Sequence, residues 1–423
     1  MIPQRALPDV LAAERGLTRL DAGLADPAHA RRCACDAARR SALALAQLDG
    51  TLVAADDLLL ALASPAEVEL PQRTAAAAAA ATYRLLLALH DGLTPAAEAR
   101  DEVPKDGRLR PETVAAWSSL TAETRRLLAE AEAALHAGED EGDGEDAPAP
   151  VRPLAPWTLP WVEEIHARWY EAHHGRRPAP WPEPPRETAR SVLRLVEEAL
   201  GADPGVAGAA RALHRLHTAP DFPNTPRPDA GDGDEQSHEI RRYIASRAGG
   251  GWWPQFARIV APWLFARACH LDRVCLPVTA CWRRDQTGYR LALGGSEDDW
   301  VAWMARLVAE AAESEARRSE LIEARHAQWI AATAVVPRLP KRRSDTLGPT
   351  RRQRAGTRRS TGRLPRLLDL LWEQPMVSTR AVERRLGMTY RSALDLIQDL
   401  EQAGVLRRAT ERKLDRLWRA GTL

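Results

Sequence analysis

The stretch TGRLPRLLDLLWEQPMVSTRAVERRLGMTYRSALDLIQDLEQAGVLRRATERKLDRLWRAGTL, residues 361–423, combines helical periodicity with turn signals that can be placed residue by residue. Its first segment ends before Pro375 and has leucines on one face: Leu364, Leu367, Leu368 and Leu371. Ser378 is a preferred N-cap residue for a second helix over 379–386. Gly387 ends that helix, because glycine tolerates a positive φ.

A third helix and two strands are expected in the rest of this stretch. Thr389 caps a helix over 390–403, and Gly404 ends it. The inner face of this helix is apolar, with Ala393, Leu394, Ile397 and Leu400. A strand begins at Val405 and Leu406, and the return strand contains Leu414, Leu417 and Trp418. The turn between the strands is basic, with Arg407, Arg408, Arg412 and Lys413. This order of elements predicts a winged helix-turn-helix.

The third helix of such a domain enters the DNA major groove with its N-terminal residues nearest the base edges. Here those residues are short or basic hydrogen-bond donors, namely Thr389, Tyr390, Arg391 and Ser392. Gln398 lies further along the same exposed face, and the cations of the basic turn are expected on the phosphate backbone. The alternative is a winged helix that contacts only protein, since folds are reused for other functions.

The charge distribution places the nucleic-acid contact at the C-terminus. The whole chain has a net charge of +1, but residues 338–423 contain 21 Lys and Arg against nine Asp and Glu, a net of +12. Residues 1–337 therefore carry −11. The segment before the winged helix is a basic linker with Lys341, Arg342, Arg343, Arg351, Arg352, Arg354, Arg358 and Arg359. Double-stranded DNA is the expected partner, with salt-dependent affinity from this linker.

The rest of the chain is expected to be helical, which makes the fold class mainly α. Five regions are predicted: an N-terminal helical segment (1–137), an acidic and proline-rich linker (138–160), a helical core (161–336), the basic linker (337–363) and the winged helix (364–423). Within these regions helices are expected throughout 1–63 and over 75–90, 109–136, 161–174, 185–200, 206–216, 238–246, 252–269 and 298–331.

Composition predicts a cytoplasmic protein without a membrane partner, metal or cofactor. The chain has no apolar run of about 20 residues and no signal-peptide core at its start. The five cysteines lack zinc-ligand spacing and are interpreted as reduced thiols. His214 and His217 lie three apart on an expected helix, but no further ligand lies at a spacing that completes a metal site.

Residues 1–336, which precede the basic linker, are called the body from here on. Four segments of the body resemble the Fic (Fic/Doc-like) family: ALALAQLDGT (42–51), LHRLHT (213–218), RIVAPWLFARACHL (258–271) and EDDWVAWMARLVAEAA (297–312). The resemblance implies a helical bundle related to enzymes that transfer AMP to a protein hydroxyl. It also implies that Asp49 and Gly50 replace the family's inhibitory Glu-Gly pair.

The catalytic loop of that family is degenerate in this chain. Active members carry a His-Pro-Phe, acidic residue, Gly-Asn-Gly-Arg loop, and the aligned residues 247–258 read RAGGGWWPQFAR. The histidine, the asparagine and the first arginine are replaced by Arg247, Trp253 and Gln255. Arg258 alone fits, as a possible anion contact. The resemblance therefore implies a body without catalytic residues.

These observations favour a DNA-binding transcriptional regulator whose inactive Fic-like body serves for dimerisation or sensing. A homodimer would read a palindromic site. One alternative is a protein AMP transferase with an altered site that keeps Arg258 on phosphate. Another is an interaction module that binds no DNA. An aromatic ligand pocket could form around Trp252, Trp253 and Trp263.

Overall fold

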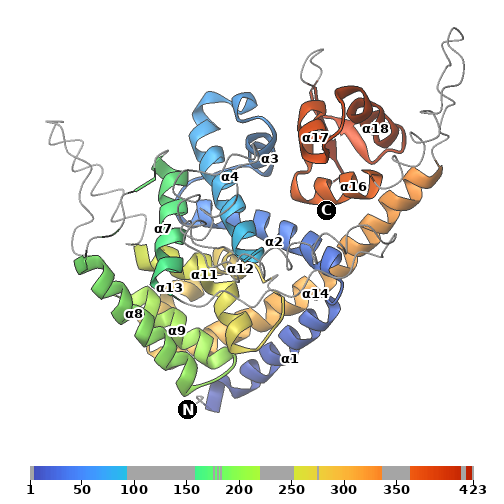
Figure 1. Ribbon diagram of the computed structural model, residues 1–423. Helices are drawn as coiled ribbons and strands as arrows, with labels where there is room; N and C mark the ends of the chain where they lie inside the picture. Colours follow the sequence, from blue (N-terminus) through green and yellow to red (C-terminus); the bar gives the residue numbers. More distant parts are fainter. Residues whose placement is uncertain are drawn as a thin grey trace, which may run out of the picture. The chain divides into compact units, whose positions relative to one another are not determined.

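The computed structural model describes residues 4–92, 158–174, 177–178, 181, 183–219, 252–273, 276–335, 363–410 and 416–421. These residues are mainly helical, as the sequence predicts, and their strands lie near the C-terminus (Figure 1). No helix in this part of the chain is both long enough and apolar enough to span a membrane.

The N-terminal residues form a succession of helices with short breaks. In order they are η1 (Gln4–Ala6), α1 (Leu7–Gly23), α2 (Pro27–Leu48), α3 (Ala55–Ala63), η2 (Pro65–Glu67) and α4 (Leu70–His90). Asp26 begins α2 as its N-cap, because its carboxylate accepts the N–H groups of Ala28 and His29 at 3.2 and 3.0 Å. Gly50 has a φ of 81° and separates α2 from α3. The helices predicted within 1–63 and over 75–90 are confirmed.

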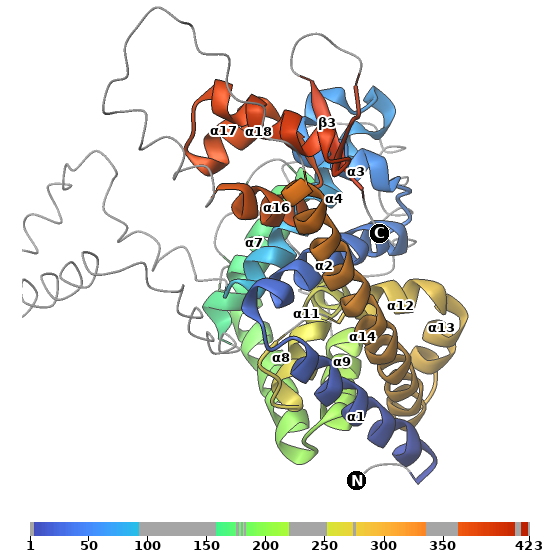
Figure 2. The same ribbon diagram turned by 90° about the vertical axis from the view of Figure 1, so that its right-hand side faces the viewer.

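A second set of helices builds the core of the body. They are α7 (Leu159–His174), α8 (Glu183–Ala202), α9 (Val206–Thr218), α11 (Trp252–Ala268), α12 (Val278–Arg284), α13 (Gln286–Gly294) and α14 (Glu297–Val335). α9 packs against both α8 and α11, and its buried face includes Leu213 and Leu216. α1 runs along α14 (Figure 2), and a Cβ at Gly16 would lie 3.0 Å from the Cβ of Ala312. Glycine at this position permits the close crossing.

The predicted helices of the core are confirmed except where the sequence pattern was short. Helices over 161–174, 185–200, 206–216, 252–269 and 298–331 are present, with ends that move by a few residues. The structure corrects two regions. α7 begins at Leu159, inside the expected linker 138–160, and α12 and α13 were not expected. α13 depends on Asp285, whose carboxylate caps it by accepting the N–H of Gly288 at 2.9 Å. The expected helices over 109–136 and 238–246 lie outside the described residues, as do residues 138–157 and 336–362 of the two linkers.

The C-terminal elements are α16 (Arg363–Glu373), β1 (Met376–Ser378), α17 (Thr379–Leu386), α18 (Tyr390–Gln402), β2 (Leu406–Arg408) and β3 (Leu417–Ala420). The three helices match the predicted ones closely. The sheet is antiparallel and has the order β1-β3-β2. Trp418 of the central strand β3 lies opposite Val377 of β1 and, on its other side, opposite Arg408 of β2. β1 was not expected from the sequence, because three residues after a proline are too few to show an alternation of apolar and polar side chains.

Candidate nucleic-acid interface

The first turn of α18 is fixed by local hydrogen bonds that the sequence predicts. Gly387 ends α17 in the left-handed region, with a φ of 59° and a ψ of 42°. Thr389 is the N-cap of α18, and its hydroxyl accepts the N–H of Ser392 at 3.3 Å and lies 3.0 Å from the Ser392 hydroxyl. Only residues 387–389 separate the two helices, so α18 begins directly after a tight turn.

The outer face of α18 presents a tyrosine, an arginine and a glutamine. Ala393, Ile397 and Leu400 are fully buried on its inner face. Tyr390 is 50% exposed, the Arg391 side chain is 85% exposed, and Gln398 is exposed. Arg391 lies 3.4 Å from the carboxylate of Asp395 one turn later, an ion pair worth only a few tenths of a kcal/mol when this exposed. Arg391 is therefore available to an anion or a base edge.

The expected site residues divide into accessible and engaged side chains. Thr389 and Ser392 bond each other at the helix start, so their hydroxyls serve first to build the turn. Arg407 is exposed on β2, whereas the Arg408 guanidinium donates to Glu401 at 2.7 Å. Other predicted contacts fall outside the described residues: Arg412, Lys413 and the basic linker residues Lys341, Arg342, Arg343, Arg351, Arg352, Arg354, Arg358 and Arg359.

Basic residues of α17 were not singled out by the sequence analysis. Arg380 and Arg384 are exposed and lie one turn apart, so they share a face of the helix that precedes α18. Arg385 is partly neutralised by Glu373 at 2.7 Å. The spacing of Arg380 and Arg384 in TRAVERRL would have been sufficient to find them.

Comparison with known proteins agrees with this geometry. Residues 364–419 match a protein family described as "HTH DNA binding domain". The chain carries a C-terminal HTH DNA-binding domain. The match covers α16 to β3 and leaves the body outside, so the body's resemblance to the Fic family stays a prediction. No curated protein matches the chain.

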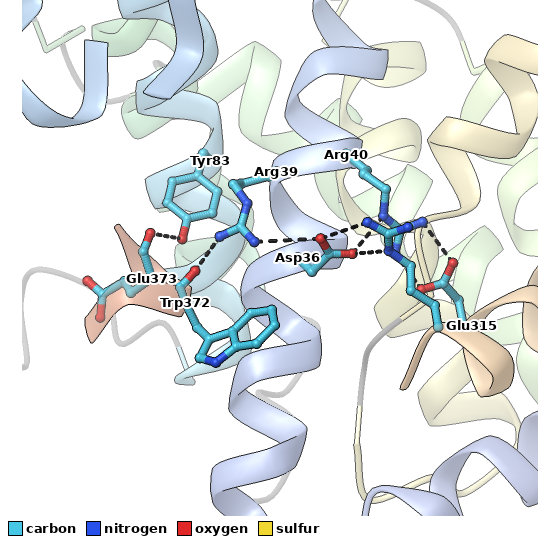
Figure 3. Close-up of polar contacts among 8 residues, drawn as sticks. Asp36, Arg39, Arg40, Tyr83, Glu315, Trp372 and Glu373 are labelled. Carbon is cyan, nitrogen blue, oxygen red and sulfur yellow. Dashed lines mark hydrogen bonds and ion pairs between the residues drawn. The ribbon is translucent and has the colours of Figure 1, made fainter. Parts of the chain in front are cut away.

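The body holds the HTH domain by the C-terminal end of α16 (Figure 3). Arg39 of α2 donates to the backbone carbonyl of Trp372, and the Tyr83 hydroxyl of α4 donates to that of Glu373 at 2.6 Å. The last carbonyls of a helix have no partner within the helix. Side chains of the body therefore complete the end of a helix that belongs to the HTH domain.

A buried charge cluster positions Arg39. Asp36 is 5% exposed, one helical turn before Arg39 and Arg40 on α2. The Asp36 carboxylate accepts from Arg40 at 2.9 Å and from Arg318 of α14 at 2.5 and 3.1 Å, and Arg40 also donates to Glu315 at 2.8 and 2.5 Å. Burial by itself would raise the pKa of Asp36, but the hydrogen bond from Arg318 and the neighbouring guanidinium charges lower it to about 2. Asp36 is thus ionised at neutral pH and orders the arginines around it.

Apolar contacts and further ion pairs extend this docking surface. The indole of Trp372 lies 5.0 Å from that of Trp329 on α14, and Leu59 of α3 packs with Met376 and Leu417 of the sheet. Two ion pairs join the same surfaces: Arg32 with Asp369 at 3.1 Å and Arg419 with Asp56 at 2.9 Å. α16 lies between α2 and the α17–α18 pair (Figures 1 and 2). The docked side of the HTH domain is therefore α16 and the sheet, and the start of α18 is exposed.

The possible anion contact, Arg258, lies inside the body. It is 5% exposed, and its Nη1 donates to the Asp49 carboxylate at 3.1 Å, to which Gln255 also donates. Trp252 and Trp253 begin α11 and are buried, so they belong to a helix and not to a phosphate-binding loop. An incoming anion would have to displace Asp49 to reach Arg258.

The expected aromatic pocket around Trp252, Trp253 and Trp263 is not formed, because all three indoles are buried. Trp252 packs edge-on against His166 with ring centroids 4.7 Å apart, and Trp253 packs in the same manner against Phe256 at 5.8 Å. Trp263 is 7% exposed. These indoles fill the core. The cavity beside α11 has Trp169 in its wall instead.

Proposed function

We propose that this protein is a DNA-binding regulator of transcription that reads double-stranded DNA with the first turn of α18. The observation that carries the proposal is that the body contacts α16 and the sheet of the HTH domain, whereas Tyr390 and Arg391 remain exposed. In HTH domains this turn meets base edges in the major groove. Arg391 is the side chain best suited to a bidentate contact with guanine.

Phosphate contacts are proposed on both sides of α18. The β2–β3 hairpin is proposed as a wing that follows the backbone, with Arg407 as its most accessible described cation and Arg412 and Lys413 in its turn. Arg380 and Arg384 lie on α17, the helix that crosses the backbone in related domains. These cations fix register and add salt-dependent affinity without reading sequence. The basic linker adds to the same electrostatic term.

The body is proposed to be a scaffold without enzymatic activity that pairs two copies or senses a ligand. Two observations support this proposal. Arg258 forms an ion pair with Asp49, and the helix α11 begins at Trp252, where the resemblance would require a catalytic loop. A homodimer would place two α18 helices on half-sites one helical turn of DNA apart, about 34–36 Å, and would select a palindromic sequence.

The test is selection of duplexes from a random pool by the full chain, followed by titration of the preferred duplex and a scrambled one. Arg391→Ala should weaken binding to the preferred duplex by about 1–3 kcal/mol and reduce the preference at one base pair. Arg317→Ala is the matched control, because Arg317 is 69% exposed on α14. Equal loss on both duplexes would remove Arg391 as a base reader. Failure of the full chain to select or retain any duplex at low salt would favour the interaction module instead.

A further inference from the structure

A cleft of about 370 Å³ opens between α2, α4, α7 and α11. This volume is at the lower end of the range of about 300–1,000 Å³ that small-molecule sites occupy. Its walls are mostly apolar, with the alanines Ala75, Ala78 and Ala79 of α4 on one side and Trp169 of α7 among the remaining residues. The size and the small side chains suit a small molecule with an apolar body.

Three polar side chains of the cleft, His173, Gln255 and Thr82, each direct a donor at a neighbouring protein acceptor. His173 donates through Nδ1 to the carbonyl of Trp169 at 2.8 Å, so its Nε2 is the acceptor of the neutral ring. Gln255 donates its amide N–H to Asp49, and the Thr82 hydroxyl donates to the carbonyl of Ala78 at 3.0 Å. Gln255 and Arg258 both donate to Oδ1 of Asp49, and within the described residues Oδ2 accepts no hydrogen bond. Acceptor atoms therefore remain on Asp49, Gln255 and His173 in the wall of the cleft.

We infer that this cleft binds a small organic amine, with the ammonium group on Asp49, Gln255 and His173 and the apolar body against α4 and Trp169. An ammonium has three donors and no acceptor, which complements these groups. The face of an indole also attracts a cation. The Arg258 charge lies behind Asp49, is 5% exposed and is not part of the cleft wall, so Asp49 stands between it and the ligand.

The amine is proposed to act as an effector, and this step rests on the proposed function. α2 and α4 carry both the cleft and the contacts that hold the HTH domain. Thr82 lines the cleft, and the next residue, Tyr83, donates to the end of α16. On α2, Asp49 follows the helix that carries Arg39. A ligand that moves α2 or α4 therefore changes the support of the HTH domain.

Binding is tested first, without DNA, by calorimetric titration of the full chain with tryptamine. Indole-3-propionate is the comparison, because it has the same ring and the opposite charge. The protein should bind tryptamine, a ligand of small size, with a Kd of about 1 mM or tighter. Indole-3-propionate should bind at least about tenfold more weakly, because its carboxylate meets acceptors. Absence of tryptamine binding, or equal affinity for both compounds, would overturn the inference.

The location is tested with a pair of variants on one helix. Ala78→Leu projects three further carbon atoms into the cleft, whereas Ala77→Leu places them on the exposed side of α4. Ala78→Leu should weaken tryptamine binding at least about tenfold while Ala77→Leu leaves it unchanged. Equal affinity of both variants would place the amine elsewhere. In the wild type, DNA affinity that does not change with saturating tryptamine would overturn the effector role alone. Absence of DNA binding both with and without tryptamine would overturn the proposed function and the effector role with it, and would leave the amine site standing.

Discussion

Replacing Tyr83 by Phe removes one oxygen atom from the contact that holds the HTH domain. The ring is 2% exposed and stays in the core. Burial, together with the nearby Cys35, raises the pKa of Tyr83 well above its usual value, so the phenol is protonated and donates at neutral pH. Its bond to the carbonyl of Glu373 is 2.6 Å long. A bond of this kind contributes about 1 kcal/mol net, and leaving the carbonyl unsatisfied costs about 1 kcal/mol more.

The Tyr83→Phe variant should therefore lower the free energy of unfolding by about 1–2 kcal/mol in urea titrations of the full chain. Because the carbonyl belongs to the last turn of α16, the loss of stability should be greatest at that end of the helix. Amide exchange at the end of α16, including the N–H of Gln374 that bonds Leu370 at 2.7 Å, should accelerate by a factor of about 5–30. DNA sequence preference should not change, because Tyr83 lies on the docked side.

Tyr390→Phe is the matched control for this experiment. It deletes the same atom from a side chain that is 50% exposed on α18, and should change the unfolding free energy by less than about 0.5 kcal/mol. It also reports on the DNA-facing turn, which Tyr83→Phe leaves intact. If both variants unfold alike and exchange at the end of α16 is unchanged, the body does not hold α16 by this bond.

Four other expectations can be measured on the full chain. Asp36 has its pKa lowered to about 2 from 3.8, so its contribution of about 2 kcal/mol is complete above about pH 5 and is lost as the pH falls toward 2. The difference in unfolding free energy between wild type and Asp36→Asn should narrow over that interval, and a constant difference would contradict the assignment. Arg407→Ala should weaken binding to all duplexes alike and reduce the slope of log K against log salt by about 1, which titrations at several salt concentrations would show. Gly387→Ala should lower the free energy of unfolding in urea by about 1 kcal/mol, because Gly387 has a φ of 59°. The added Cβ would have no atom within 4 Å, so the cost comes from the backbone angle alone. Gly23→Ala is the control, because that site has equal space and no positive φ, and it should not lower the free energy of unfolding. Burial raises the pKa of the Cys33 thiol to about 12, so iodoacetamide should label it in urea and not in the native protein; rapid native labelling would show that the thiol is accessible.

The sequence was informative wherever structure is determined by neighbouring residues. The ends of α17 and α18 follow from Ser378, Gly387 and Thr389, whose hydrogen bonds and backbone angles span at most a few residues. The long apolar periodicity of α14 was equally clear. β1 and α12 were missed because each has seven residues or fewer and its stability comes from its packing partner.

The docking surface could not have been predicted from the sequence. Arg39 and Trp372 are 333 positions apart, and a charged residue within RRCACDAARRS gives no indication that it is 11% exposed at the side chain and bonded to a distant carbonyl. The same holds for Asp49 and Arg258, which the Fic resemblance identified separately and the structure joins at 3.1 Å. Helical periodicity shows which face of α2 is buried but not which element covers it.

The way the HTH domain is held has a consequence for how the protein would read DNA. An HTH domain on a free tether finds its half-site with an effective concentration set by the linker. Here the body caps α16, covers the sheet through Leu59 and joins it through the Asp56–Arg419 pair, so the orientation of α18 is set by α2, α3 and α4. Pairing of two bodies would then fix the separation of two α18 helices. In the regulator proposed here, spacing between half-sites becomes a property of the body, and base choice a property of Arg391 and its neighbours.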